Sequence, residues 1–234
     1  MPGQPARAVP ASGLVRVCLW LYLPILALLA LIAVASGDDF PKVLHVLTQD
    51  PLASQRQVPY LAWLHHLTVL AWTAAAGIAL AAGIALSSCT ATPSLQRRCR
   101  LLRHLAGFTC LLIFDDVFML HEVWLPRLLP MLPATAVEAA VYAVYALLGV
   151  ALLLADGREI RWTDWPTGLS AGALLGLSAS AYVLAQALGF GRWLLSPVED
   201  ASKLLGAFGW SIYLLGVACG GWRQIAATLP AAER

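Results

Sequence analysis

Residues 111–124 read LLIFDDVFMLHEVW and place three carboxylates and a histidine inside an otherwise apolar stretch. The chemically active side chains are Asp115, Asp116, His121 and Glu122. A charged side chain near the middle of a membrane costs about 2.5–3.5 kcal/mol even on the permissive insertion scale, so such residues mark candidate functional sites. In a continuous helix Asp115 and Glu122 share one face, and Asp116 is turned about 100° away from it. These residue types are suited to binding a cation or exchanging protons.

A second polar stretch near the C-terminus carries three charged residues, Glu199, Asp200 and Lys203. Lys203 lies ten residues from Trp193, whereas Asp116 and Asp115 lie eight and nine residues from Trp124. If both tryptophans mark the same membrane interface, these spacings correspond to depths of about 12–15 Å at the helical rise per residue. We therefore predict an ion pair between Lys203 and Asp115 or Asp116. One lysine cannot neutralise the acidic cluster, which predicts a bound cation, shared protons or a cationic ligand group.

Two further acidic residues match helix-capping patterns. Thr135 and Glu138 form a T-x-x-E box. Ser196 and Glu199 form an S-x-x-E box, with Pro197 at the expected first helical position. Glu138 is therefore predicted to cap a helix rather than to bind a ligand, and for Glu199 capping and a role in the site both remain open.

Histidines and carboxylates are suitable ligands for a divalent metal, so a metal site is considered. The histidines nearest the acidic cluster in this reading are His65, His66 and His121. No helix contains an H-x-x-x-H, E-x-x-H or H-E-x-x-H pair, and the adjacent His65 and His66 point about 100° apart. A divalent metal is possible only if several helices each supply one ligand, and no strong motif predicts such a site.

The composition shows what kind of elements position these residues. Hydrophobic residues make up 60% of the 234 residues and charged residues only 12%, about half the charged share of soluble domains. Apolar runs long enough to cross a bilayer, about 20 residues each, predict one all-α polytopic transmembrane bundle of six helices. Their approximate ranges are 14–36, 60–87, 101–124, 135–155, 167–189 and 197–221.

The distribution of arginine and lysine predicts the orientation of this bundle. With a cytoplasmic N-terminus, ten Lys and Arg residues lie on the inner side and four on the outer side, which follows the positive-inside rule. Both termini are then cytoplasmic and the acidic site faces outward. The absence of asparagine and the excess of Arg over Lys suggest a bacterial chain of the inner (plasma) membrane. The AVASG segment at 33–37 resembles a signal-peptidase site, although the long preceding run favours an uncleaved first helix.

Small residues predict how the helices pack. Gly168, Gly172, Gly176 and Ser180 form a small-xxx-small ridge of the kind that allows membrane helices to approach closely. The GLSAG segment at 168–172 matches a hydrolase nucleophile pattern, but that pattern requires a strand–turn–helix context and is assigned no chemistry here.

Three stretches of the chain resemble a family of uncharacterised bacterial multi-pass membrane proteins: LTQDPLA (47–53), FDDVFMLHE (114–122) and EDASKLLGAFGW (199–210). Their order and spacing span most of the chain. The resemblance implies a multi-pass helical fold and no particular mechanism. It points to seven matching site positions, Asp115, Asp116, His121, Glu122, Glu199, Asp200 and Lys203. The family resembled has small polar residues where this chain has His65 and His66, which implies that these histidines are not essential ligands.

Three functional hypotheses follow. The first is a membrane protein with an outward-facing acidic, histidine and lysine site that binds a cation or exchanges protons. The second is a membrane-embedded, possibly metal-dependent hydrolase that acts on lipid or a lipid-linked substrate, with His121 and Asp116 or Glu122 in proton transfer. The third is a structural or assembly subunit of a membrane complex.

The expected partners are the lipid bilayer, with a lipid or small cationic ligand and an oligomer both possible. Nucleic-acid binding is not expected, because the basic segment at 97–103 is short and adjoins a membrane span. The inner half of the bundle is predicted to be apolar, which argues against a continuous path for ions.

Overall fold

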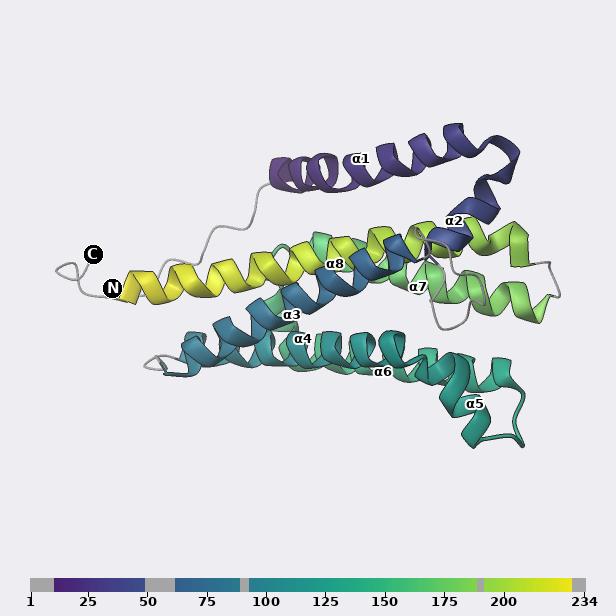
Figure 1. Ribbon diagram of the computed structural model, residues 1–234. Coiled ribbons are helices and arrows are strands. Elements are labelled where there is room, and N and C mark those ends of the chain that lie inside the picture. The colour runs from purple at the N-terminus through teal and green to yellow at the C-terminus, as the bar shows by residue number, and fades with distance from the viewer. Residues whose placement is uncertain (1–10, 49–61, 89–92, 189–191, 229–234) are drawn as a thin grey trace.

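The computed structural model describes residues 11–48, 62–88, 93–188 and 192–228, and within these ranges the chain is helical and contains no β-strand. The long helices run alternately up and down along one axis (Figure 1). Their bounds are α1 (Ala11–Ser36), α3 (Trp63–Ser88), α4 (Pro93–Phe118), α6 (Ala134–Ile160), α7 (Trp165–Ala187) and α8 (Arg192–Thr228). Shorter helical segments are η1 (Gly37–Asp39), α2 (Phe40–Thr48), η2 (Leu120–Trp124) and α5 (Leu125–Leu128).

Five segments of the described chain are long and apolar enough to cross a membrane, which identifies a membrane-embedded, multi-pass helical protein. They are Tyr22–Thr48, Trp63–Ser88, Ala134–Ile160, Trp165–Ala185 and Pro197–Gln224. The predicted third span is absent from this set. Helix α4 carries arginines in its first half and two aspartates near its end, so its composition alone does not mark it as a crossing.

The tightest part of the bundle lies around α8, which packs against α3, α4 and α7. Fully buried apolar residues from α3, α4 and α8, including Leu86, Leu102, Leu105 and Leu214, form one cluster. The bundle has two ends (Figure 1). The end containing η1, α2 and η2 is called the Trp124 end, and the end where α4 begins and α6 finishes is called the Arg98 end.

The close approach of α7 and α8 depends mainly on glycines of α8, and of the three glycines in the predicted ridge of α7 only Gly168 takes part in it. A Cβ at Gly206 would lie 2.9 Å from the backbone nitrogen of Leu175, so no larger residue fits without movement. Gly168 lies beneath the ring of Tyr213, but a Cβ at Gly172 or Gly176 would meet nothing within 4 Å. The ridge prediction is therefore wrong for these two glycines, because α7 turns a different face toward α8.

Both predicted capping boxes are wrong, because the two helices begin earlier than their patterns indicate. Helix α6 starts at Ala134. Its N-cap residue is Pro133, which makes no side-chain capping hydrogen bond, so Thr135 lies inside the helix. Helix α8 starts at Arg192, which places Pro197 inside it.

The predicted continuous helix over 101–124 is also interrupted. Met119 adopts a left-handed conformation, with φ 51° and ψ 42°, and separates α4 from the π-helical turn η2. The new segment continues through α5 and ends before Pro130. Asp115 and Glu122 consequently do not share a helix face, because the seven-residue relation holds only in an unbroken helix.

Helix α2 is an element that the sequence reading did not identify. Gly37, with φ +53°, is the first residue of the 3₁₀ turn η1, and α2 then lies beside α3 and α8 (Figure 1). Its Leu44 is fully buried in a cluster with Leu64 of α3 and Leu204 of α8. The short helix therefore covers the Trp124 end of the bundle next to Lys203.

Candidate functional site

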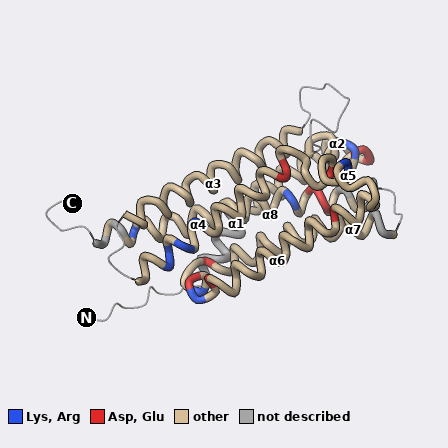
Figure 2. Tube along the Cα trace, turned by 90° about the horizontal axis from the view of Figure 1, so that it is seen from below, with Lys and Arg blue, Asp and Glu red and all other residues tan. Residues whose placement is uncertain are grey.

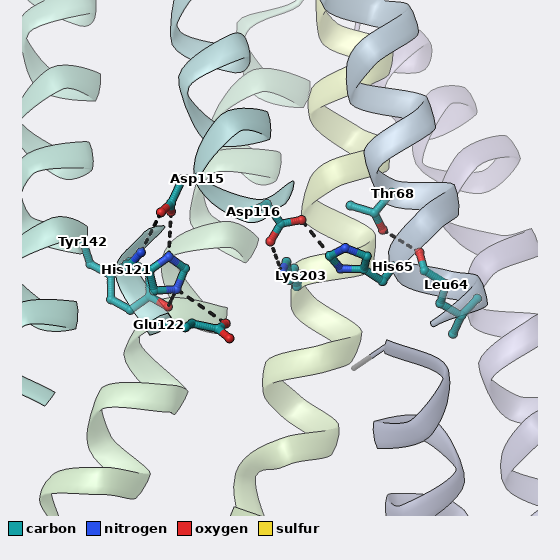
Figure 3. Close-up of polar contacts among 9 residues, drawn as sticks. All are labelled: Leu64, His65, Thr68, Asp115, Asp116, His121, Glu122, Tyr142 and Lys203. Atoms are coloured by element: carbon teal, nitrogen blue, oxygen red, sulfur yellow. Dashed lines mark hydrogen bonds and ion pairs between the residues drawn. The ribbon is translucent and has the colours of Figure 1, made fainter. Parts of the chain in front are cut away.

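Asp116 on α4 is paired with Lys203 on α8, which confirms the predicted ion pair and selects one of its two alternatives. The distance from Lys203 Nζ to Asp116 Oδ1 is 2.5 Å (Figure 3). His65 of α3 lies on the other side of the carboxylate, with Nδ1 3.7 Å from Asp116 Oδ2. Asp116 retains only 10% side-chain exposure, and its Oδ2 is buried without a hydrogen-bond partner, so the ion pair through Oδ1 offsets only part of the cost of removing this carboxylate from water.

Asp115 is paired with His121 rather than with Lys203. Its carboxylate accepts a hydrogen bond from the backbone N–H of His121 at 3.0 Å, and its second oxygen lies 2.7 Å from Nδ1 of the same residue (Figure 3). The Tyr142 hydroxyl of α6 lies 3.0 Å from His121 Nε2. Asp115 and His121 are both buried. Asp115, His121 and Tyr142 therefore form one hydrogen-bonded chain, called the His121 relay below.

The break at Met119 explains why a carboxylate is tolerated at this position. The sequence places Asp115 near the C-terminus of a helix, where the helix dipole disfavours an anion. The structure brings its carboxylate to a backbone donor in the first turn of the next helical segment, the N–H of His121. A helix N-terminus favours a carboxylate, so this contact offsets the unfavourable dipole that α4 presents at Asp115.

The remaining predicted site residues occupy different surroundings. Glu122 is 42% exposed, and its Oε1 lies 3.7 Å from His121 Nε2, which places it at the outer margin of the His121 relay. Glu138 is buried on α6, four residues before Tyr142. His66 is exposed, whereas the adjacent His65 is buried. Glu199 and Asp200 are partly buried in the first part of α8.

A small pocket adjoins the Lys203 pair between α2, α3 and α8. It has room for roughly one water molecule, and it combines apolar and polar side chains. Its lining residues are Thr48, Leu64, His65, Thr68, Asp200, Lys203 and Leu204. Asp116 and Asp115 therefore face different surroundings from two faces of α4: the first faces the pocket helices and the second faces α6.

Within the described residues, no group of three or more His, Cys, Asp and Glu side chains is arranged to hold a metal ion. The expected ligands are distributed between two separate pairs, and each imidazole or carboxylate already has a protein partner at the positions shown in Figure 3.

Two tyrosines of α6 belong to the site and were not identified from the sequence. Tyr142 contacts His121, and Tyr145 lies beside Asp115. The signal was present in the spacing, because Glu138, Tyr142 and Tyr145 follow one another at intervals of four and three residues and share one helix face. Their assignment required knowing that this face of α6 is turned toward α4.

A second polar network lies at the Arg98 end, so the prediction of an apolar inner half is wrong. Asp156 of α6 is buried, with Arg100 Nε at 2.9 Å and His104 Nδ1 at 2.6 Å. Glu159, one turn further along α6, lies 3.0 Å from Arg98 Nε. The predicted helix over 135–155 ends before both acids, so the sequence did not predict their contacts with α4. Figure 2 shows charged residues near both ends of the bundle.

Two tryptophans pack in the middle of the bundle, between these two polar regions. Trp210 of α8 donates a hydrogen bond from Nε1 to Thr109 of α4 at 2.9 Å, and Trp72 of α3 donates to the carbonyl oxygen of Ala207 at 3.1 Å. Both indoles thereby satisfy their donors while filling the space among α3, α4 and α8 with apolar surface. The site at the Trp124 end is thus separated from the network at the Arg98 end by packed side chains.

The chain has no significant match among curated proteins or among solved structures. A family described as a domain of unknown function, DUF8692, matches residues 17–217. That range contains the His121 relay, the Asp116–Lys203 pair and the network at the Arg98 end. The chain therefore belongs to the DUF8692 family of domains of unknown function.

Proposed function

We propose that this protein is a proton-exchanging membrane protein whose site opens at the Trp124 end, on the outer side of a bacterial inner membrane. The His121 relay carries the proposal. It joins a buried carboxylate to an imidazole, and the second imidazole nitrogen lies between the Tyr142 hydroxyl and the partly exposed Glu122. Imidazole accepts and releases protons at two distinct nitrogens near neutral pH, so this arrangement can pass a proton between Glu122 and Asp115.

Proton exchange accounts for the charges better than binding of a metal cation. Lys203 already neutralises Asp116, and Asp115 is bound to His121. A proton shared along the His121 relay relieves the remaining excess of negative charge without further ligands. The packed tryptophans in the middle of the bundle favour exchange with one side of the membrane over conduction through it.

The proposal includes a sixth membrane crossing by α4. This helix has 26 residues, which corresponds to about 39 Å and exceeds the thickness of a bilayer core. It lies beside α3 along the bundle axis (Figure 1). Its arginines are near one end and its aspartates near the other, and the aspartates have partners inside the bundle. Such pairing is the usual means by which charged residues are accommodated in a membrane.

Infrared difference spectroscopy tests proton exchange directly. Protein reconstituted in lipid is cycled between mildly acidic and neutral buffer, and the difference spectrum is recorded. We expect a protonated-carboxyl band and an imidazole band that disappear together in Asp115→Asn and in His121→Gln. The control His66→Gln alters an exposed histidine outside the relay and should retain both bands. Wild-type protein without either band would contradict the proposal.

A hydrolase that uses His121 as a general base toward water is the second candidate. The observation that favours it is the carboxylate–imidazole pair, in which Asp115 orients the ring as the third member of a catalytic triad does. Vesicles of phosphatidylethanolamine and phosphatidylglycerol incubated with the protein would then yield cleaved lipid, detectable by mass spectrometry. Cleavage by the wild type and loss of it in His121→Gln would favour the hydrolase, and intact lipid would exclude it for these substrates.

A further inference from the structure

We infer that Met119 is a positioning residue for the His121 relay, acting through the backbone and not through its side chain. The inference rests on the proposed proton exchange, because it assigns the residue that assembles the exchanging pair. Met119 is one of two non-glycine residues in the described chain that have a positive φ, and it is the one located between Asp115 and His121.

An unbroken helix cannot form the contact between His121 and Asp115. Six residues separate the two positions, which in a regular helix corresponds to about 9 Å along the axis and to faces about 120° apart. The structure instead brings both the backbone N–H and the Nδ1 of His121 to the same carboxylate, at 3.0 and 2.7 Å. The chain must therefore reverse its local helical sense between these residues, and Met119 is where it does so.

The conformation at Met119 also sets the geometry of the following turn. Its carbonyl oxygen accepts hydrogen bonds from the backbone N–H groups of Val123, at 2.9 Å, and Trp124, at 3.3 Å. The second of these has the wider spacing of a π-helical turn. Left-handed residues and single π turns are both recurrent at functional sites, where the surrounding packing holds a conformation that the chain otherwise disfavours.

Methionine is not the residue that a left-handed position prefers. Glycine adopts this conformation freely, unbranched side chains accept it at a cost, and β-branched side chains rarely adopt it. Met119 is only 5% exposed, so a larger replacement must also fit the packed space around its side chain. The position thus tolerates leucine but disfavours isoleucine, although the two side chains have the same composition and volume.

Leucine and isoleucine therefore provide a matched pair of variants. Met119→Leu, Met119→Ile and Met119→Gly are prepared with ¹⁵N-labelled histidine in lipid nanodiscs, and the His121 ring N–H signal is assigned by its loss in His121→Gln. A hydrogen-bonded Nδ1–H exchanges slowly with water and remains visible. We expect the signal to be retained in Met119→Leu, retained in Met119→Gly, and reduced about tenfold in intensity in Met119→Ile, the scale of a strained backbone conformation.

The same samples separate this inference from the proposed function. If the His121 signal is as strong in Met119→Ile as in Met119→Leu, the positioning role is overturned, whatever the infrared bands show. If the signal is lost in Met119→Ile but the pH-dependent infrared bands persist, Met119 does position His121 and proton exchange through His121 is the claim that fails. If Met119→Ile fails to fold, the smaller β-branched variant Met119→Val is compared with Met119→Leu. Equal His121 signals in that pair overturn the inference.

Discussion

The contact between Lys203 and Asp116 shows how single residues make a polar site compatible with this bundle. The ammonium and carboxylate groups lie 2.5 Å apart, and Asp116 is 10% exposed. The neighbouring Asp115 achieves the same result with a histidine and a backbone amide. Two adjacent carboxylates thus use different partners on different helices, and each pair can be tested by removing one member.

Removing the Lys203 ammonium leaves Asp116 without its closest partner. Removing one member of a buried ion pair lowers the free energy of unfolding by about 3–5 kcal/mol. We expect Lys203→Met to lose about 3 kcal/mol, the lower end of this range, because Lys203 is 34% exposed. We expect the double variant Lys203→Met/Asp116→Asn to recover part of this loss. The measurement is the free energy of unfolding in mixed detergent micelles.

The chain provides a matched control in Lys42, which pairs with Asp39 while both side chains are more than 60% exposed, at 69% and 65%. An exposed pair of this kind contributes about 0–1 kcal/mol, so Lys42→Met should have little effect. Equal losses for the two lysine variants would show that the Asp116 pair does not behave as a buried one.

At the scale of helices, α8 acts as the central element because glycines allow α7 to lie directly against it. The contact at Gly206 leaves no space for a methyl group, since the nearest backbone atom of α7 would be 2.9 Å away. Helix α6 is attached differently. Only 11% of its most apolar stretch is buried, and its polar contacts are ion pairs to α4 at the Arg98 end and the hydrogen bond between Tyr142 and His121 of η2 at the Trp124 end.

Gly206→Ala should destabilise the contact between α7 and α8. Overpacking by one methyl group costs about 1–3 kcal/mol when the neighbouring backbone must move. Gly216 lies on the same helix with open space around it, so Gly216→Ala should be neutral or slightly stabilising because alanine is the better helix former. Thermal unfolding of both variants, followed by circular dichroism, gives the comparison, and a loss of equal size in the two would contradict it.

Asp156→Asn should weaken the attachment of α6 at the Arg98 end. The substitution removes a carboxylate that interacts with both Arg100 and His104 while its side chain is fully buried. Loss of hydrogen bonds to charged groups costs about 1.5–3 kcal/mol. Arg158→Gln changes an exposed residue of the same helix and should stay within about 0.5 kcal/mol of the wild type. Unchanged stability of Asp156→Asn would mean that this network does not hold α6.

At the scale of the whole molecule, alternating helices place one polar site at each end of the bundle and an apolar layer between them. The positive-inside rule predicts that the Arg98 end faces the cytoplasm. Six crossings follow only if α4 spans the membrane, so the topology can be tested independently of function.

Cysteine labelling distinguishes five crossings from six. In a chain whose five native cysteines are replaced, single cysteines are introduced at Asp38, Met131 and Arg161. If α4 crosses, an impermeant thiol reagent added to intact cells should label Asp38→Cys and Met131→Cys and leave Arg161→Cys unlabelled. Met131 is 94% exposed, so poor access does not explain a negative result there. Labelling of Asp38→Cys without Met131→Cys would show that α4 does not cross.

The amino-acid sequence alone predicts that this is a multi-pass helical membrane protein, and it predicts the ion pair between Lys203 and one of the two aspartates of α4. Apolar runs must form helices in a membrane because backbone groups find no water there, so the long helices were predictable to within a few residues at most ends. The agreement in depth between Lys203 and the aspartates predicted their ion pair. Both inferences use properties that depend on distance along a helix alone.

The tertiary structure decided which aspartate each partner takes and which residues join them. The break at Met119 is not visible in the residue pattern, because methionine favours helix and rarely adopts a left-handed conformation. It turns His121 toward Asp115 and moves Glu122 to the margin of the site. The roles of Tyr142, Asp156 and Glu159 depend on which face α6 turns toward α4. Rotation of a helix about its axis is set by packing with its neighbours, so one helix's sequence cannot fix it.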